Sequence, residues 1–467
     1  MENLKLKAFE NNIRGKRVAV IGLGVSNIPL IDYLHDLGAN VTVFDEIIDE
    51  RFLEKDLVQK IRDYGFELVT GENALHFLRG FKIIFRSPSC LPSTLQLRSE
   101  QKRGAIVTSE IEMLMNTCPC KIIGITGSDG KTTTTSLIYE ILKEGRYNCH
   151  LGGNIGIPLF TKVKDFKEDD IVVLELSSFQ LMEMEVSPDI SVITNISPNH
   201  LDKHKDYDEY IEAKKTIFKF QGEDGKVVLN YDNKVTRHCS EQADGKVVFF
   251  SSKEKLEDGV IYDNGIIKEC KDGVRKHLID TKDVHLRGIH NYENICAAIA
   301  ATSGLVDTET QIRAIKNFKG VEHRLEFVRE LDGVKWYNDS IGTSPSRTIA
   351  GLNSFDEKIV LIAGGYDKNL DYRPLAKPIL EKVTKLVLMG KTSKKIYDAV
   401  TSELAKDPDV VFPIYRVNTL EEAVVRARKL ANPGEVVLFS PASASFDMFR
   451  NFAERGKEFK RFVNELK

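Results

Sequence analysis

The sequence has few of the features that mark secreted or membrane proteins. Its seven cysteines are scattered, and only Cys118 and Cys120 stand close together, at neither a zinc nor a thioredoxin spacing. No run approaches the roughly 18 apolar residues of a membrane-spanning helix, and the first residues have no apolar signal core. We therefore expect a cytoplasmic protein with no membrane partner, in which reduced cysteines serve packing.

The formal net charge is only −3, so no overall basic field invites nucleic acid as a partner. Hydrophobic residues (42%) and charged residues (29%) occur in the proportions of globular proteins. The 467 residues are too many for one hydrophobic core, and they contain no short repeat or low-complexity linker. The length predicts about two to four domains.

The strongest motif is a glycine-rich loop at residues 124–132, GITGSDGKT. It resembles the phosphate-binding pattern G-x-x-x-x-G-K-[ST], although its outer glycines stand six residues apart instead of five. A buried-type strand (121–126) precedes the loop and a helix pattern (132–143) follows it, so backbone N–H groups and a helix N-terminus can surround phosphates. Lys131 would reach the β- and γ-phosphates, and Thr132 would hold Mg²⁺. We favour nucleotide binding over an ordinary turn.

A second glycine-containing turn follows the first predicted strand, residues 17–21. A helix and a strand that ends in Asp45 come next, which is the order found in dinucleotide-binding folds. Asn27 stands where the third glycine of that fingerprint belongs, so the evidence for NAD is weak. An NAD(P)-dependent oxidoreductase that uses residues 17–45 remains an alternative.

Candidate metal ligands follow two strands that we expect beside the phosphate-loop strand. Glu175 ends the strand at 170–174, where folds of this kind place a Mg²⁺ ligand, although it could instead cap a helix. His200 and Asp202 follow the strand at 190–194 and could reach the same edge of the sheet. On these residues alone, a structural role for His200 is slightly favoured.

Lys214 occupies an unusual position in a predicted helix. Apolar residues at helical spacing surround it, namely Tyr207, Tyr210, Ile211, Ile217 and Phe218. Its stem can pack while its ammonium reaches water, or its amine can lose a proton and be chemically modified. The sequence does not choose between these interpretations.

Two further regions have simpler interpretations. Residues 226–286 show the alternating pattern of β-strands, with turns at 263–265 and 272–273. We expect these strands to have a structural role more than a catalytic one. Asn294 precedes an alanine-rich helix at 295–303, where its amide could read a base edge or cap the helix.

The last third of the chain repeats a doubly wound pattern. Its strands are predicted at 334–337, 359–363, 385–388 and 435–439. Each strand runs into a polar or glycine-rich loop. Asp339, Lys368 and Ser445 in these loops should therefore converge at the carboxyl edge of the sheet. The complete prediction is an α/β protein with a Rossmann-like domain at 1–109, a central P-loop ATPase-like domain with a parallel sheet at 110–319, and a Rossmann-like domain at 320–467.

Together these motifs resemble the Mur ligase superfamily over nearly the whole chain, and most closely its D-glutamate-adding branch. The resemblance rests on residues 124–132, 175–180, 199–202, 323–324, 338–340, 440–447, 449–452 and 454–456. The longer spacing of the phosphate loop fits the version in this superfamily. Three departures are Asp129, where Asn is common, Ser89, where Gly is common, and the pair Ile341-Gly342.

The resemblance implies an ATP-dependent, ADP-forming carbon–nitrogen ligase of peptidoglycan precursor synthesis. ATP would convert the carboxylate of UDP-N-acetylmuramoyl-L-alanine into an acyl phosphate, which the amine of D-glutamate then attacks. It also implies a pair of Mg²⁺ ions and a monomeric enzyme. Another amino-acid-adding ligase, a folylpolyglutamate synthase and a nucleotide-binding regulatory protein without catalysis remain alternatives.

The resemblance also implies roles for individual residues. The catalytic set is Lys131, Glu175, His200 and Lys214. The metal ligands are Thr132, Glu175, His200 and a carbamylated Lys214. ATP is bound by Gly127, Ser128, Asp129, Gly130, Lys131, Thr132, Thr133, Asn294, Arg324 and Asp339. The UDP-substrate contacts are Val25, Ser26, Asp45, Ser87 and Asn154, and the D-glutamate contacts are Thr343, Lys368, Ser445 and Phe452. Because these groups come from different domains, we expect domain closure about a hinge near residue 320.

Overall fold

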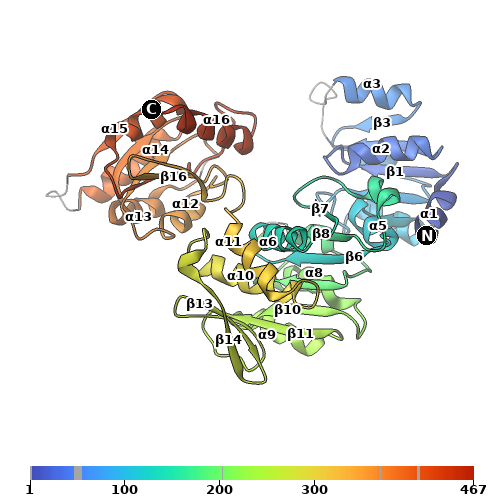
Figure 1. The fold of residues 1–467 in the computed structure, drawn as a ribbon. Helices are drawn as coiled ribbons and strands as arrows, with labels where there is room; N and C mark the ends of the chain where they lie inside the picture. Colours follow the sequence, from blue (N-terminus) through green and yellow to red (C-terminus); the bar gives the residue numbers. More distant parts are fainter. Residues whose placement is uncertain (1–2, 47–54, 202, 369, 407–410) are drawn as a thin grey trace. The chain divides into compact units, whose positions relative to one another are not determined.

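The computed structural model describes residues 3–46, 55–201, 203–368, 370–406 and 411–467. They form helices and three β-sheets, which lie in the blue, the cyan-to-yellow and the orange-to-red parts of Figure 1. The predicted α/β class is confirmed. The chain divides into two compact units, residues 1–281 with 293–315 and residues 282–292 with 316–467. Among the described helices, none is long and apolar enough to cross a membrane.

The first sheet has five parallel strands in the order β3-β2-β1-β4-β5. Its strands are β1 (Arg17–Ile21), β2 (Asn40–Asp45), β3 (Glu67–Thr70), β4 (Ile83–Arg86) and β5 (Ile106–Thr108). The accompanying helices are α1 (Leu4–Ile13), α2 (Asn27–Asp36), α3 (Lys55–Asp63), η2 (Ala74–Phe77) and α4 (Leu95–Lys102). The strand order reverses between β1 and β4, which is where open α/β sheets bind ligands.

The central sheet has nine strands in the order β14-β13-β12-β11-β10-β9-β6-β8-β7. Its strands are β6 (Lys121–Thr126), β7 (Cys149–Gly153), β8 (Ile171–Glu175), β9 (Ile190–Ile193), β10 (Lys226–Asn230), β11 (Lys246–Ser251), β12 (Gly259–Asp263), β13 (Ile266–Lys271) and β14 (Val274–Asp280). β12, β13 and β14 pair antiparallel, and all other neighbours are parallel. The parallel core strands β6, β8 and β9 are almost wholly buried, as expected for a sheet covered on both faces.

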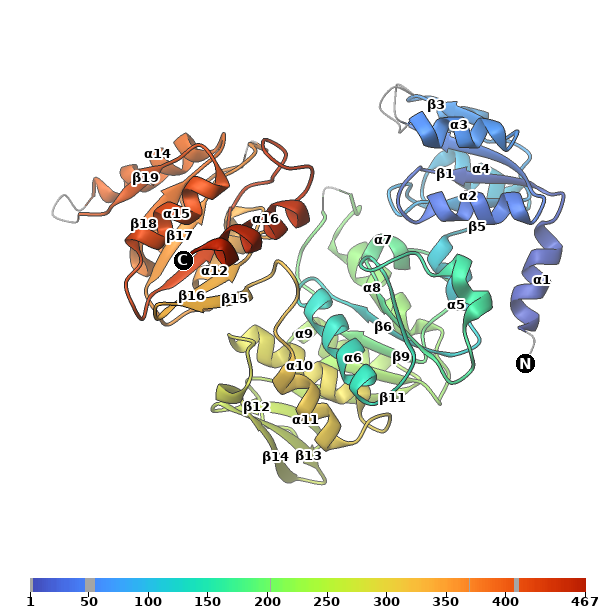
Figure 2. The same ribbon diagram turned by 45° about the horizontal axis from the view of Figure 1, so that its top comes forward.

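Helices cover the central sheet and connect it to the first (Figures 1 and 2). They are α5 (Glu110–Thr117), α6 (Lys131–Glu144), η3 (Phe160–Asp165), α7 (Ser178–Leu181), α8 (Tyr207–Lys219), α9 (Lys234–Cys239), η4 (Ser240–Gln242), η5 (Thr281–Asp283), α10 (Ile289–Thr302) and α11 (Thr308–Asn317). Phe160 packs edge-on against Phe9 of α1 and Tyr33 of α2, with ring centroids 5.4 and 5.5 Å apart. The first and central sheets therefore share one continuous hydrophobic core.

The third sheet has six strands in the order β15-β16-β20-β17-β18-β19, of which only β15 is antiparallel to its neighbour. Its strands are β15 (Glu326–Leu331), β16 (Val334–Asn338), β17 (Ile359–Ala363), β18 (Val383–Leu388), β19 (Ile414–Arg416) and β20 (Val436–Phe439). Its helices are α12 (Pro345–Leu352), α13 (Arg373–Lys382), α14 (Ser393–Leu404), α15 (Leu420–Leu430) and α16 (Phe452–Glu465). Phe459 of α16 packs against Trp336 and Phe439 of the sheet.

Several elements differ from the expectation drawn from the sequence. Helix α10 begins at Ile289 instead of residue 295, so Asn294 lies in its second turn and does not precede it. The early start escapes an argument from apolar spacing because Ile289 and His290 are exposed. The sequence pattern also does not predict the edge strands β5, β7, β15 and β19, whose residues are mostly half-buried or exposed.

Candidate active site

The glycine-rich loop between β6 and α6 has backbone geometry that only glycine can supply. Gly127 has φ 151°, and a Cβ there would lie 1.9 Å from Thr194 Oγ1. Gly130 has φ 80°, and a Cβ there would lie 2.3 Å from Asn294 Oδ1. These close approaches let the chain fold tightly before the first turn of α6, so the loop presents backbone N–H groups at a helix N-terminus.

The segment that follows β9 holds the glycine-rich loop in place through hydrogen bonds. The Ser128 hydroxyl donates to the Ser197 carbonyl at 2.9 Å and accepts the Ser197 N–H at the same distance. Asn195 holds both backbone groups of Asp129, accepting its N–H at 3.0 Å and donating to its carbonyl at 3.2 Å. The Asp129 side chain itself is exposed, so water screens its charge.

Two lysines converge on the loop. Lys131 Nζ donates to the carbonyls of Gly127 and Ser128 at 2.8 and 3.1 Å. Lys214 Nζ donates to the same Gly127 carbonyl at 2.8 Å and to Thr126 Oγ1 at 3.2 Å, and it lies 4.8 Å from the centre of the Tyr210 ring. Lys214 is only 1% exposed, which excludes the interpretation in which its ammonium reaches water.

Burial first, and the neighbouring Lys131 charge second, lower the pKa of Lys214 well below its ordinary value. The cost of burying an ammonium therefore favours the neutral amine at this position. A neutral amine is a nucleophile, whereas an ammonium is not. Lys214 is chemically suited to covalent modification.

Glu175 ends β8, next to the strand that feeds the loop. Its Oε1 accepts from Asn154 Nδ2 at 2.7 Å, whereas its buried Oε2 has no hydrogen-bond partner among the described residues. The cap of the following helix α7 is Ser177, which forms a capping box with Gln180. Glu175 is therefore not a helix cap, and its bare oxygen fits the donor set of a hard cation.

The structure gives two nearby histidines different environments. His200 is exposed, has φ 56° and places its ring edge-on to Phe179, with ring centroids 5.3 Å apart. His204 is buried, stacks on Phe179 and lies 3.0 Å from Ser178 Oγ through Nε2. Asp202 lies outside the described residues. Within those residues, no three His, Cys, Asp or Glu side chains form a metal-binding group.

The nucleotide-base candidate Asn294 reaches the loop from α10. Its Oδ1 accepts from Thr134 Oγ1 at 3.2 Å, in the first turn of α6. Thr132 is half-buried and Thr133 is buried in the same turn. Lys131, Thr132, Lys214, Glu175 and Asn294 thus surround one end of β6.

The carboxyl edge of the first sheet gathers the predicted UDP-substrate residues. Asp45 Oδ2 accepts the Leu23 N–H at 2.8 Å, and Ser87 Oγ lies 2.8 Å from Ser89 Oγ. Asn27 is buried and donates to the carbonyls of Ile21 and Gly22, which explains why a third glycine is not needed.

Three other predicted substrate residues lie on the loops around these edges. Val25 is 75% exposed and Ser26 is half-buried in the turn after β1. Asn154 follows β7, and its backbone N–H also donates to the Glu175 carbonyl at 2.7 Å. Arg86, which sequence reasoning missed, is buried and donates to the Met182 and Phe179 carbonyls, so it ties the first sheet to the central one.

In the second compact unit, Asp339 is buried at the end of β16. Its Oδ2 accepts from Ser440 Oγ at 2.7 Å and its Oδ1 accepts the Leu325 N–H at 3.3 Å. Burial raises the pKa of Asp339 to about 6, although the Ser440 hydrogen bond and the Arg324 charge oppose the shift. The carboxyl group links the turn that contains Arg324 to the loop after β20.

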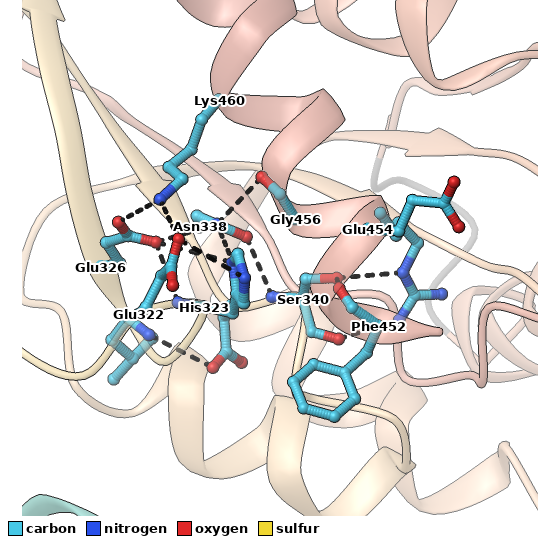
Figure 3. Close-up of polar contacts among 12 residues, drawn as sticks. Glu322, His323, Glu326, Asn338, Ser340, Phe452, Glu454, Gly456 and Lys460 are labelled. Atoms are coloured by element: carbon cyan, nitrogen blue, oxygen red, sulfur yellow. Dashed lines mark hydrogen bonds and ion pairs between the residues drawn. The ribbon is translucent and has the colours of Figure 1, made fainter. Parts of the chain in front are cut away.

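His323 connects the end of β16 to the start of α16 through its contacts with Asn338 and Gly456 (Figure 3). Its Nδ1 accepts from Asn338 Nδ2 at 3.0 Å, and its ring fills the space that a side chain at Gly456 would need, because a Cβ there would lie 2.3 Å from Nδ1. Lys460 donates to Glu322 and Glu326 at 2.7 and 2.8 Å on the same side. Burial lowers the pKa of His323, which favours the neutral ring.

Arg455 lies in the stretch 454–456 that carries the resemblance, but no role is assigned to it from the sequence. It is fully buried and donates to Ser340 Oγ and to the carbonyls of Ser340, Ser443 and Ala444, at 2.8 to 3.1 Å. Burial lowers its pKa to about 10. One guanidinium therefore joins the loop after β16 to the loop after β20. Its spacing with Phe459 and Val463 on the buried face of α16 is the signal that could have revealed it.

The predicted D-glutamate residues lie around these loops. Ser445 is buried, and the adjacent Ala444 forms a β-bridge with Tyr366 that brings the loop after β17 to it. Lys368 Nζ lies 5.4 Å above the Phe446 ring, and the Phe452 carbonyl accepts from Ser340 Oγ at 2.8 Å.

Thr343 is half-buried in the turn before α12. A cavity of about 460 Å³ lies beside the loops that follow β18 and β20. Lys391, Arg416 and Asp447 are among the residues that line it, and none of the predicted D-glutamate residues does.

Family models cover most of the chain. Residues 125–302 match the model described as the Mur ligase middle domain, and residues 323–443 match the Mur ligase glutamate ligase domain. The UDP-N-acetylmuramoylalanine--D-glutamate ligase of Acetivibrio thermocellus is 47% identical over 467 residues, which cover 99% of both chains. The ligase of the same name from Clostridium novyi is 48% identical over 458 residues, or 98% of each chain.

Solved structures show the same fold at lower identity. The UDP-N-acetylmuramate-alanine ligase MurC of Thermotoga maritima superimposes with a TM-score of 0.58 at 19% identity and covers 97% of this chain and 100% of its own. The MurF ligase of Thermotoga maritima, in complex with ADP, gives a TM-score of 0.54 at 18% identity and covers 98% and 97%. From its two family models and its full-length relatives, we conclude that the chain belongs to the Mur ligase family.

Proposed function

We propose that the protein is an ATP-dependent ligase that adds D-glutamate to UDP-N-acetylmuramoyl-L-alanine in peptidoglycan precursor synthesis. The observation that carries the proposal is the identity of 47–48% with ligases of that name, over 98–99% of both chains. The same proposal places the enzyme in the cytoplasm, because its cosubstrate ATP is an intracellular metabolite. We expect it to act as a monomer.

The reaction must overcome the poor reactivity of a carboxylate, whose leaving group would be oxide. Transfer of the γ-phosphoryl group of ATP to the alanyl carboxylate gives ADP and an acyl phosphate. The D-glutamate amine attacks the acyl carbon, an amide bond forms, and phosphate leaves with the oxygen that the carboxylate supplied. Such a reaction depends mainly on positioning and charge neutralisation.

Residues 127–133 are proposed to hold the ATP phosphates. The tight loop, its backbone N–H groups at the start of α6, and the Lys131 ammonium support this role. Asn294 is proposed at the base, and Arg324 and Asp339 are proposed as nucleotide contacts from the second unit.

Thr132, Glu175, His200 and Lys214 are proposed as the ligands of a pair of Mg²⁺ ions. The bare buried oxygen of Glu175 supports a cation there. Bound Mg²⁺ would neutralise the negative charge of the transferring phosphoryl group. Mg²⁺ prefers oxygen ligands over an amine nitrogen. For Lys214 to supply such oxygens, we propose a carbamate formed by addition of its neutral amine to CO₂. Its burial and lowered pKa support that step.

The remaining assignments concern the two other substrates. Val25, Ser26, Asp45, Ser87 and Asn154 are proposed to contact the UDP-substrate, and Thr343, Lys368, Ser445 and Phe452 to contact D-glutamate. Lys368 has a direct physical role, because a dicarboxylate needs a cationic partner. The proposed domain limits are 1–109, 110–319 and 320–467, with closure about a hinge near residue 320.

Phosphate release tests the proposal. With ATP and UDP-N-acetylmuramoyl-L-alanine, we expect release only when D-glutamate is added. Equal release with L-lysine or diaminopimelate would overturn the choice of amino acid. Tight NADH binding without ATP binding would instead support an oxidoreductase.

A further inference from the structure

Two cysteine thiols touch at the connection between the first and central sheets. Cys118 follows the last turn of α5, and Cys120 directly precedes β6, with Pro119 between them. Their Sγ atoms are 3.4 Å apart. All seven cysteines lie within the described residues and are free thiols.

The two thiols have different exposure. Cys118 is partly exposed, whereas Cys120 is only 8% exposed and belongs to the hydrophobic core. A reagent can therefore reach Cys118 first, with Cys120 behind it at contact distance.

The electrostatics distinguish Cys118 from the other cysteines. The hydrogen bond from the Cys120 thiol lowers the pKa of Cys118, although burial and the carboxylates of Asp189 and Asp170 oppose the shift. Burial raises the pKa of the partly exposed thiols Cys90 and Cys149. A thiolate is the reactive form of cysteine, so the pair has one activated sulfur and one proton donor.

We propose that Cys118 and Cys120 form a reversible modification site, at which a hydroperoxide oxidises the two thiols to an intramolecular disulfide. This goes beyond the proposed ligase function, because neither residue belongs to the proposed substrate or metal site. The site lies at the amino end of β6, and the phosphate loop follows the carboxyl end of the same strand.

The chemistry balances with the hydroperoxide as the oxidant. The Cys118 thiolate attacks the peroxide, the O–O bond breaks, and Cys118 becomes a sulfenic acid with release of water or an alcohol. The Cys120 sulfur then attacks the Cys118 sulfur, the S–O bond breaks, and a second water leaves with the Cys120 proton. Two thiols are oxidised and one peroxide is reduced.

Closure needs only a small movement, from 3.4 Å to the S–S bond length of about 2.05 Å. The ring contains a single intervening residue, so the disulfide is strained. Strained disulfides have more oxidising potentials, and a small thiol will reduce this one readily. The modification is therefore reversible.

Peroxide treatment of the reduced full-length chain tests the proposal. After brief exposure to hydrogen peroxide and alkylation under denaturing conditions, we expect the seven free thiols to fall by the two at Cys118 and Cys120. Intact mass should show the loss of two hydrogens, and peptide mapping should place the cross-link at residues 118–120. Added dithiothreitol should restore all seven.

Three variants make the result specific. Cys118→Ser should slow peroxide consumption by about tenfold or more. Cys120→Ser should leave a sulfenic acid at Cys118 that a 1,3-diketone probe captures. Cys149→Ser, which removes a partly exposed single thiol, should react like the unchanged protein. Each variant should keep full ligase activity under reducing conditions, so this test does not depend on the proposed function.

Either of two results would overturn the proposal. One is oxidation of Cys149 or Cys90 as fast as Cys118 in the unchanged protein. The other is a Cys118→Ser variant that consumes peroxide at the original rate. If Cys118→Ser does not fold, the mapping of oxidised thiols in the unchanged chain still decides between these outcomes.

Discussion

Lys214 is a lysine in a place where an ammonium ion is costly. Its amine contacts a carbonyl and a hydroxyl beside the phosphate loop, and Lys131 lies close enough to add repulsion. The apolar stripe on α8 identified the position from sequence, but the choice between surface and buried orientations needed the contacts with β6. The burial of the amine favours the interpretation in which it loses a proton and is chemically modified.

Lys214→Ala should abolish most ligase activity. The loss should exceed the roughly 10- to 100-fold cost of removing a supporting partner of a metal ligand. Short carboxylates should restore part of the activity, because they can replace the carbamate. Steady-state rates with and without added acetate measure this. Lys219→Ala, at an exposed position of the same helix, is the control, and full activity in Lys214→Ala would remove the residue from the mechanism.

Lys368→Ala should raise the KM for D-glutamate by at least about tenfold, because a dicarboxylate loses its cationic partner. The KM for ATP should change much less. Initial rates with each substrate varied separately give both constants. An unchanged response to D-glutamate would argue against the proposed pocket.

Other residues show where sequence reasoning ends. Glu175 could be selected from its position at a strand end, because strand order and edge follow from local pattern. Arg86 could not, because its partners are backbone carbonyls far along the chain. For Arg455, the helical spacing with Phe459 and Val463 indicates burial but does not indicate which groups it contacts. Every residue has a backbone carbonyl, so the sequence does not show which carbonyls such a side chain will contact.

Among the elements, most strands follow from short apolar runs that end in polar or glycine-rich loops. The start of helix α10 and edge strands such as β15 and β19 are not predicted in this way, since exposed residues begin the helix and half-buried or exposed residues form these strands. Packing against neighbouring elements decides where this helix begins and whether these strands form.

Helix α5 has a buried carboxylate in its first turn that makes stability depend on pH. Glu110 Oε1 accepts the N–H groups of Leu159 and Phe160, and burial raises its pKa from 4.5 to about 7. The unfolded chain therefore ionises first, so this group destabilises the fold increasingly as pH rises from 4.5 to about 7 and constantly above that.

Glu110→Gln keeps the accepting oxygen and removes the charge. It should stabilise the protein by up to about 3 kcal/mol at pH 8 and by little at pH 4.5. Denaturant unfolding at both pH values measures the difference. Glu421→Gln, at an exposed position in the first turn of α15, should show no such dependence. An equal effect of Glu110→Gln at both pH values would contradict the account.

Helix α16 carries the guanidinium that joins two loops of the proposed D-glutamate pocket. Lysine has no planar fork and cannot reach all four acceptors, so Arg455→Lys should displace Ser445 and neighbouring groups. We expect the KM for D-glutamate to rise by roughly 10- to 100-fold, with a smaller change for ATP. Arg461→Lys, an exposed change on the same helix, is the control. Equal changes for both substrates would indicate a general loss of structure.

For the molecule as a whole, the proposed site divides between two compact units. Lys131, Glu175 and Lys214 belong to the first, and Asp339 and Lys368 belong to the second. A reaction that needs both sets requires the units to close on ATP and the UDP-substrate. Small-angle X-ray scattering should then show a smaller radius of gyration when both are added. An unchanged radius would weaken the proposed closure.

The central claim is that the alanyl carboxylate is activated by phosphorylation before D-glutamate attacks. It is tested most directly by labelling that carboxylate of UDP-N-acetylmuramoyl-L-alanine with ¹⁸O and analysing the phosphate released in the presence of ATP and D-glutamate. The account predicts that each phosphate carries one ¹⁸O atom, together with an amide-linked D-glutamyl product. Unlabelled phosphate, or labelled phosphate without that product, would contradict it.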